Sequence, residues 1–152
     1  MADDSQQVRA LVLALLDVAG IGRISTARDA DETWSTLHAF APDLLITDWN
    51  MPPTSGLDLV RRLRRDAASP NRFLPVIMLS AYGEEHRIRA ARFAGVTEFL
   101  VKPVSANTFL DRLHAVIEDK RPFVETTTYF GPDRRRGLRP PWEGPDRRGG
   151  RP

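Results

Sequence analysis

Residues 44–52 read Leu-Leu-Ile-Thr-Asp-Trp-Asn-Met-Pro, an uninterrupted apolar run that stops at Asp48 and is followed by a proline. Strands buried on both faces of a parallel sheet have this continuous apolar character. Runs of the same kind occur at Pro75–Leu79 and Glu98–Val101, and a shorter one at Ile24–Ala27. The chain therefore contains several short strands that we expect to lie inside one parallel sheet.

Amphipathic helices are expected between these strands. Apolar residues in the segment 8–19 recur at a spacing of three and four, which places them on one face of a helix. Ser5 is expected to cap its start. Similar patterns predict the remaining helices at Asp31–Phe40, Leu57–Arg65, Glu84–Ala94 and after a capping Ser105. Alternating strands and helices predict the α/β class, a doubly wound parallel sheet covered by helices on both faces.

Polar residues stand where three of the expected strands end. Asp48, Ser80 and Lys102 each follow an apolar run, and functional groups of such sheets gather at the carboxyl ends of the strands. With the pair Asp3-Asp4 they provide the parts of a phosphoryl-acceptor site. A carboxylate accepts a phosphoryl group when a divalent cation neutralises charge and donors hold the oxygens. We expect Asp48 to be nucleophile and metal ligand, with Ser80 and Lys102 as contacts of the phosphoryl oxygens.

The expected cofactor of this site is Mg²⁺, which prefers carboxylates, a carbonyl and waters. Its expected protein ligands are Asp3, Asp4, Asp48 and the carbonyl of Asn50.

Four segments together resemble the signature blocks of CheY-like receiver domains, in the family's order and spacing over residues 3 to about 120. They are Asp3-Asp4-Ser5, Thr47-Asp48-Trp49-Asn50-Met51-Pro52, Val76-Ile77-Met78-Leu79-Ser80-Ala81 and Phe99-Leu100-Val101-Lys102-Pro103. The resemblance implies a flavodoxin-like fold with sheet order 2-1-3-4-5. It also implies phosphorylation of Asp48 by a histidine kinase, with Ser80 and Phe99 as a coupled switch pair.

The chain departs from this family at its start. Family members have a full apolar strand before the acidic pair, whereas only Met1 and Ala2 precede Asp3. A late assigned start, removal of residues, or a fold that lacks the strand would each explain this. In the last case we expect Asp3 and Asp4 to be poorly anchored.

Charge divides the chain in two. Residues 1–125 carry 15 Lys and Arg against 17 acids (−2), whereas residues 126–152 carry 7 Arg against 3 acids (+4). A basic end on a nearly neutral body suggests an anionic partner for that end. The chain has no cysteine, no signal-peptide pattern, no membrane-length apolar run and no conventional catalytic motif. We expect a cytoplasmic monomer that is not an enzyme, with a receiver domain at 1–122 and a tail at 123–152.

Ten of the last 27 residues are Pro or Gly, and from Thr126 onward no apolar periodicity remains, which predicts a flexible tail. Gly-Pro-Asp-Arg-Arg nevertheless occurs twice, at 131–135 and 144–148. Arginine matches guanine O6 and N7 with two hydrogen bonds, carboxylates accept from the guanine N1–H and amine, and aromatic rings stack on bases. A ligand that presents guanine twice, such as cyclic di-GMP, suits a duplicated motif.

The tail is also similar to the arginine-rich extension of the Cle proteins, CheY-like effectors that bind cyclic di-GMP and act at the flagellar motor. This similarity implies docking on a flagellar motor switch protein and recruitment to the flagellated pole. The implied guanine and phosphate contacts are Asp133, Arg134, Arg135, Asp146, Arg147 and Arg148. Further candidates are the stacking residues Tyr129, Phe130 and Trp142 and the supporting charges Arg136 and Arg139.

Two other interpretations stay open. The tail of a nucleic-acid binder would tolerate many sequences and show steep salt dependence, but that reading does not explain the acids or the repeat. An ordinary phosphotransfer receiver with an idle tail would be unchanged by deletion of 126–152.

Overall fold

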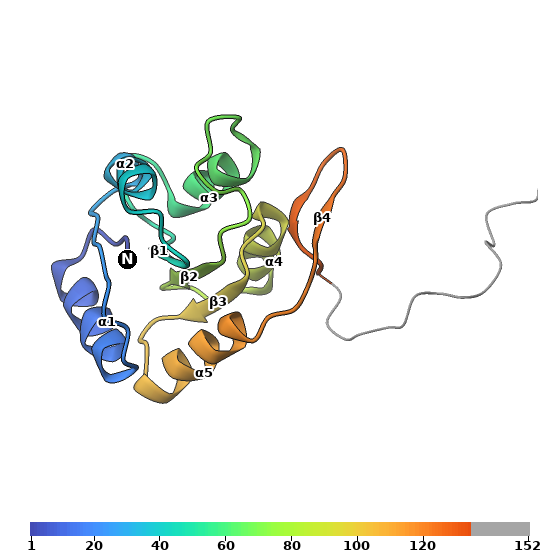
Figure 1. The fold of residues 1–152 in the computed structure, drawn as a ribbon. Coiled ribbons are helices and arrows are strands. Elements are labelled where there is room, and N and C mark those ends of the chain that lie inside the picture. Colours follow the sequence, from blue (N-terminus) through green and yellow to red (C-terminus); the bar gives the residue numbers. More distant parts are fainter. Residues whose placement is uncertain (135–152) are drawn as a thin grey trace, which may run out of the picture.

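A computed structural model describes residues 1–134. Its main sheet is parallel, with strands in the order β1-β2-β3 (Figure 1). These strands are β1 (Leu45–Asp48), β2 (Val76–Ser80) and β3 (Glu98–Val101). The helices are α1 (Gln6–Val18), α2 (Ala30–Phe40), α3 (Gly56–Arg65), α4 (Glu85–Ala94) and α5 (Ala106–Ile117). The expected helices and the three longer strands are thus confirmed, each boundary within two residues. Ser5 and Ser105 cap α1 and α5 as predicted.

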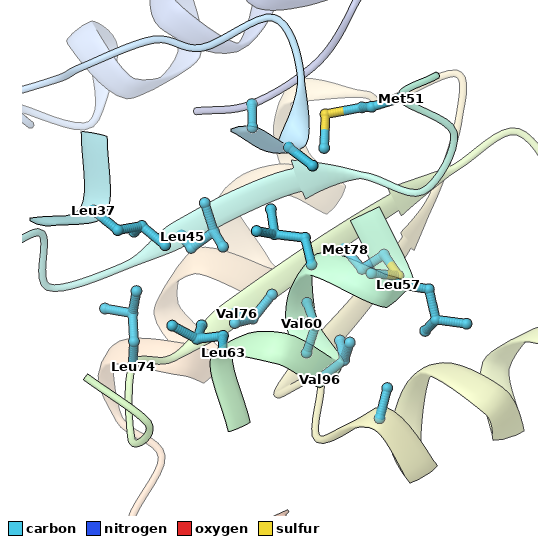
Figure 2. Packing of buried hydrophobic residues seen from close by; sticks show 14 of the residues in the cluster. Leu37, Leu45, Met51, Leu57, Val60, Leu63, Leu74, Val76, Met78 and Val96 are labelled. Carbon is cyan, nitrogen blue, oxygen red and sulfur yellow. The ribbon is translucent and has the colours of Figure 1, made fainter. Parts of the chain in front are cut away.

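Helices cover both faces of the sheet because successive strand residues point to opposite sides. Leu45, Val76 and Met78 face a core shared with α2, α3 and α4, part of which is drawn in Figure 2. Ile46, Ile77 and other residues of the same strands face a second core shared with α1 and α5. This two-sided burial explains why the strands are apolar throughout.

Residues 1–3 extend the sheet by isolated β-bridges at Ala2. Ala2 forms parallel bridges with Ala27 on one side and Thr47 on the other. The Ala2 amide donates to the Ile46 carbonyl at 2.8 Å, and the Asp3 amide donates to the Ala27 carbonyl at 3.2 Å. Asp3 is therefore held from both sides, and our expectation that it would be poorly anchored is wrong.

The strand expected at Ile24–Ala27 is wrong except at Ala27, which alone forms a bridge. This segment contacts Met1 at two points: the Ala27 amide donates to the Met1 carbonyl at 2.9 Å, and the Met1 amine donates to the Ser25 carbonyl at 2.8 Å. A cavity of about 530 Å³, lined by Met1, Ile24, Leu37 and other residues of both cores, lies there. Residues 24–26 therefore form no β-bridge, although Ser25 accepts one backbone hydrogen bond.

The chain beyond α5 forms an antiparallel hairpin of β4 (Phe123–Glu125) and β5 (Phe130–Pro132). The hairpin packs against α3 and α4 (Figure 1). Phe130 and Phe123 meet Phe73 with ring centroids 5.2 and 5.3 Å apart. Our prediction of a flexible tail from Thr126 onward is therefore wrong for residues 126–132. Three-residue strands are too short for a periodic signal, and the aromatic partner Phe73 comes from a distant part of the chain.

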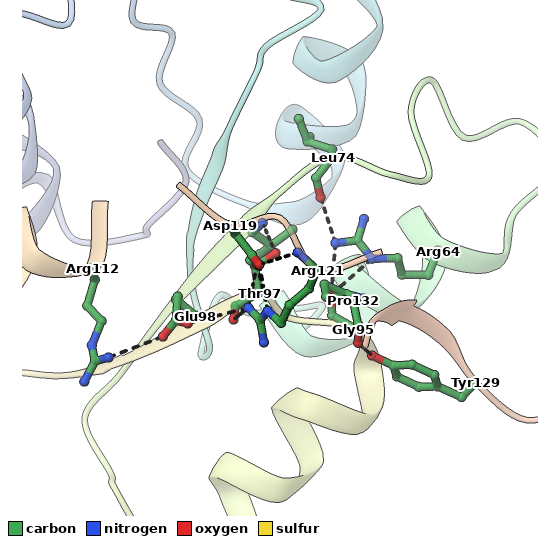
Figure 3. Close-up of polar contacts among 11 residues, drawn as sticks. Arg64, Leu74, Gly95, Thr97, Glu98, Arg112, Asp119, Arg121, Tyr129 and Pro132 are labelled. Atoms are coloured by element: carbon green, nitrogen blue, oxygen red, sulfur yellow. Dashed lines mark hydrogen bonds and ion pairs between the residues drawn. The ribbon is translucent and has the colours of Figure 1, made fainter. Parts of the chain in front are cut away.

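A buried arginine fastens this corner. Arg64 of α3 is 1% exposed, and its guanidinium donates to the carbonyls of Gly95 and Leu74 (Figure 3). Gly95 ends α4 with φ of +93°, and an added Cβ there would lie 2.7 Å from the Phe130 carbonyl oxygen. The close approach of the hairpin to α4 thus depends on a glycine at this position. No helix within residues 1–134 is long and apolar enough to cross a bilayer.

Candidate functional site

The carboxyl ends of the parallel strands bring the expected site residues to one edge of the sheet. Asp48 is the last residue of β1, Ser80 the last of β2, and Lys102 directly follows β3. Asp3 lies beside them because the preceding residue, Ala2, forms a parallel β-bridge with Thr47 of β1. Residues nearly a hundred positions apart in the chain therefore lie within contact distance.

Three carboxylates cluster at this edge. One oxygen each from Asp3, Asp4 and Asp48 lies within 4.8 Å of the others. Asp3 is fully buried and Asp48 is 5% exposed, whereas Asp4 is exposed to solvent. Hard oxygen donors, partly buried and partly open to water, form the donor set that Mg²⁺ prefers. The cluster fits such an ion, with Asp4 on the solvent side.

Lys102 compensates part of this negative charge. Its ammonium lies 2.9 Å from Oδ2 of Asp3 and 2.7 Å from Oδ1 of Asp48. Burial lowers the pKa of Lys102, but the hydrogen bonds to Asp48 and Asp3 together raise it above its usual value. The ammonium therefore stays charged. Burial raises the pKa of Asp3, and the hydrogen bond from Lys102 offsets part of that rise. The Lys102 ammonium thus contacts two of the three carboxylates, and the cluster keeps a net negative charge.

The other expected site residues surround this cluster. The backbone N–H of Asn50 donates to Oδ2 of Asp48 at 2.8 Å, which orients the carboxylate. Ser80 is 1% exposed, and its Oγ accepts from the Tyr82 amide at 3.1 Å. Phe99 is half-buried and meets Trp49 edge to face, with ring centroids 6.4 Å apart.

Comparison with known proteins agrees with this geometry. Residues 1–114 match the family model described as the response regulator receiver domain. The chain belongs to the response regulator receiver family. It is 36% identical over 120 residues to chemotaxis protein CheY1 of Helicobacter pylori, a match that covers 77% of this chain and 94% of that protein.

Two further similarities support the assignment to the receiver family. The solved structure of chemotaxis response regulator CheY4 of Vibrio cholerae has a TM-score of 0.69 at 31% identity, covering 76% of this chain and 93% of that one. The phosphate regulon regulatory protein PhoB of Pseudomonas aeruginosa is 32% identical over 122 residues, 80% of this chain and 52% of that protein. The flavodoxin-like α/β fold expected from the sequence is thereby confirmed.

Gly56 of the receiver domain is a site-shaping residue that sequence reasoning missed. A Cβ at this position would lie 1.8 Å from the carbonyl oxygen of Asp48 and 3.0 Å from Oγ1 of Thr47. The first turn of α3 therefore touches the backbone that carries Asp48. Gly56 begins α3 directly after a segment that contains two prolines, and nothing in that sequence indicates this contact.

The structure places only part of the expected tail site. Asp133 and Arg134 follow β5, and the Arg134 guanidinium lies 4.4 Å from the Tyr129 ring centroid. Tyr129 and Phe130 are 4% and 7% exposed, so the free stacking faces that we expected of them are largely covered, that of Tyr129 partly by Arg134 and that of Phe130 by Phe73 and Phe123. The other tail candidates lie outside the described residues: Arg135, Arg136, Arg139, Trp142, Asp146, Arg147 and Arg148.

Proposed function

We propose that this receiver domain is switched by transfer of a phosphoryl group to Asp48. The observation that carries the proposal is the contact of an Asp48 oxygen with Nζ of Lys102 at 2.7 Å inside a cluster of three carboxylates. Two acids beside a nucleophilic carboxylate can hold a cation, and an ammonium can pair with a phosphoryl oxygen.

In the proposed step, a carboxylate oxygen of Asp48 gives up its present hydrogen-bond partner and forms a bond to phosphorus while the bond from phosphorus to the donor breaks. For a phosphohistidine donor on a kinase, the electrons of the P–N bond stay on the ring nitrogen, and the histidine leaves as a neutral imidazole because its other ring nitrogen carries a proton. Mg²⁺, when bound by Asp3, Asp4, Asp48 and the Asn50 carbonyl, neutralises charge on the transferring group. Lys102 then exchanges its contact with Asp48 for one with a phosphoryl oxygen, and Ser80 lies at the end of the neighbouring strand.

Incubation with acetyl phosphate and Mg²⁺, read by intact-protein mass spectrometry, tests this proposal. We expect one phosphoryl adduct on the unaltered protein and none on Asp48→Asn. Asp43→Asn, an exposed acid five residues away, is the matched control and keeps the adduct. An adduct of equal yield on Asp48→Asn, or formation unaffected by chelation of Mg²⁺, would contradict the assignment.

We propose further that the tail binds cyclic di-GMP through its two Gly-Pro-Asp-Arg-Arg segments. The supporting observation is the duplication itself, which places an acid beside paired arginines twice within 27 residues. Purely phosphate-binding tails gain nothing from Asp133 and Asp146, whereas a guanine edge offers donors to a carboxylate. The first segment also begins inside β5, and directly after this strand the Asp133 amide donates to the Pro122 carbonyl at 2.8 Å.

Calorimetric titration of cyclic di-GMP tests the tail. Sub-micromolar binding is expected for the intact chain and its loss for Asp133→Ala combined with Asp146→Ala. Glu143→Ala, an acid of the tail outside both repeats, should bind as the intact chain does. Binding of RNA and cyclic di-GMP alike, indifferent to those two aspartates, would instead support the nucleic-acid reading. No binding of either would return the tail to an idle role.

We also propose that the loaded protein docks on a flagellar motor switch protein. The support is the similarity to chemotaxis proteins together with a receiver domain that carries a ligand-binding tail. A ligand that binds the docked protein more tightly than the free protein favours docking. Capture of the purified switch protein should therefore increase when cyclic di-GMP is added. Equal capture with and without it would overturn this part.

A further inference from the structure

A small basic pocket lies where α3, α4 and the hairpin meet, away from the acidic cluster. Its volume is about 180 Å³. The lining residues are Arg61, Arg64, Arg65, Phe93, Ala94, Thr128 and Phe130. Three arginines and two aromatic rings around one hollow form a setting for an anion that carries a planar group.

Arg64 gives this pocket a fixed buried cation. Its guanidinium donates to the carbonyls of Gly95, Arg72 and Leu74 at 2.7 to 3.1 Å. Burial lowers the pKa of Arg64 to about 10, so the group stays charged at neutral pH. Carbonyl oxygens satisfy its N–H groups but do not neutralise its charge. A buried positive charge with this partner set is best compensated by a nearby anion.

Arg61 and Arg65 place two further guanidinium groups at the pocket. Both are exposed on α3. Arg61 contacts Asp58 at 2.8 Å, and Arg65 donates to the carbonyl of Thr128 at 2.7 Å. Each of these contacts uses one N–H of the five that a guanidinium carries. Donors are therefore left for the oxygens of a phosphate, which guanidinium groups bind in parallel pairs.

Phe93 connects the pocket to the first repeat of the tail. This residue of α4 is 55% exposed and lines the pocket. The Arg134 guanidinium lies 4.3 Å from the Phe93 ring centroid and 4.4 Å from that of Tyr129. A face that accepts a planar guanidinium also accepts a purine base, since both stack on aromatic rings. The first repeat thus begins at the edge of the pocket.

We infer that this pocket binds one phosphate of the cyclic dinucleotide held by the tail, with Arg61 and Arg65 on its oxygens and an adjoining base on Phe93. The inference rests on the proposed ligand of the tail and adds a second, preformed half of its site. The volume supports a shared site, because pockets that enclose a whole small ligand measure roughly 300–1,000 Å³. At about 180 Å³ this one has room for only part of a dinucleotide.

A shared site has a structural consequence. Arg65 already joins α3 to the hairpin turn through Thr128. A ligand bound by both α3 and the start of the first repeat would hold Asp133 and Arg134 against the α3–α4 corner of the receiver. Contacts to residues that are already placed by the fold then offset part of the cost of binding.

Titration of cyclic di-GMP into Arg61→Ala combined with Arg65→Ala tests the inference. We expect affinity to fall at least about tenfold, because charge-assisted phosphate contacts are among the stronger hydrogen bonds. Phe93→Ala should lower affinity about fivefold through lost stacking. The matched charge control is Arg28→Ala combined with Arg62→Ala. These exposed arginines pair with Glu32 and Asp66 away from the pocket, and their loss should change affinity less than twofold.

The outcomes separate this inference from the proposed function. Unchanged affinity of the Arg61/Arg65 variant, while the Asp133/Asp146 variant loses binding, would leave the tail as the whole site and overturn the pocket. Equal losses in the Arg61/Arg65 variant and the Arg28/Arg62 control would show a general charge effect and also overturn it. No binding by the intact chain would overturn both proposals. Amide chemical shifts that move on ligand addition in residues 61–65 and 93–95, and not in residues 28–32, would support the pocket directly.

Discussion

The acidic cluster and the basic pocket are opposite solutions to the same problem of buried charge. At the carboxyl ends of the strands, three carboxylates lie close to one lysine, so this site lacks positive charge. At the α3–hairpin corner, Arg64 is buried among carbonyls with two further arginines beside it, so this site lacks negative charge. Each imbalance has a mobile ion or ligand as its natural complement. The comparison shows that one receiver domain carries an acidic cluster at one edge of its sheet and a basic pocket at a different corner.

The largest expected effect comes from removing the close contact behind Asp48. Gly56→Ala places a Cβ 1.8 Å from the Asp48 carbonyl oxygen, so α3 must move away from β1. We expect a loss of about 3 kcal/mol or more in the free energy of unfolding, measured by urea denaturation. Gly22→Ala, where nothing lies within 4 Å of an added Cβ, should change it by less than about 0.5 kcal/mol. Equal stability of the two variants would show that the close contact of Gly56 with Asp48 does not limit the stability of the fold.

A somewhat smaller effect is expected from the other region. Phe130→Ala removes a buried ring from the cluster with Phe73 and Phe123. We expect a loss of about 2–3 kcal/mol, since this cluster lies at the edge of the domain and can partly collapse. Tyr82→Ala, an exposed aromatic, is the control for urea denaturation. Phosphorylation of Asp48 should persist in Phe130→Ala, and its loss would mean that the two regions are not separate.

Charge balance at the acidic cluster gives the third effect. Lys102→Met leaves Asp3 and Asp48 without the ammonium that contacts both, and we expect a loss of about 2 kcal/mol without divalent cation. Added Mg²⁺ should raise the melting temperature of this variant more than that of the intact protein, because ammonium and metal neutralise the same oxygens. Lys120→Met, the other lysine of the chain, controls for lost charge. An identical response to Mg²⁺ in all three proteins would argue against a shared role.

The smallest expected effect is a gain rather than a loss, and it concerns ligand affinity at the basic pocket. Asp58→Asn removes the exposed carboxylate that pairs with Arg61 at 2.8 Å. Freed from this partner, Arg61 should bind the dinucleotide about two- to threefold more tightly, since exposed pairs are worth only about 0.2–1 kcal/mol. Asp31→Asn, an exposed acid in the first turn of α2, should leave affinity unchanged. Calorimetry that finds weaker binding for Asp58→Asn would place the ligand elsewhere.

The sequence by itself determined the elements and their chemistry. Apolar runs that end at Asp48 and Ser80 and helical spacing between them predicted the parallel sheet, because local environment along a buried strand or an amphipathic helix is written into neighbouring residues. The acids, the lysine before Pro103 and the duplicated tail segment were visible for the same reason.

Only the tertiary structure decided which residues meet. It buried Asp3 through pairing of Ala2 on both sides, and it covered Tyr129 and Phe130 in a hairpin that the sequence did not reveal. It brought Arg65 to Thr128, 63 residues away, and so formed the basic pocket. Contacts of this kind leave no spacing in the sequence, because they depend on the packing of whole elements rather than on the pattern within any one of them.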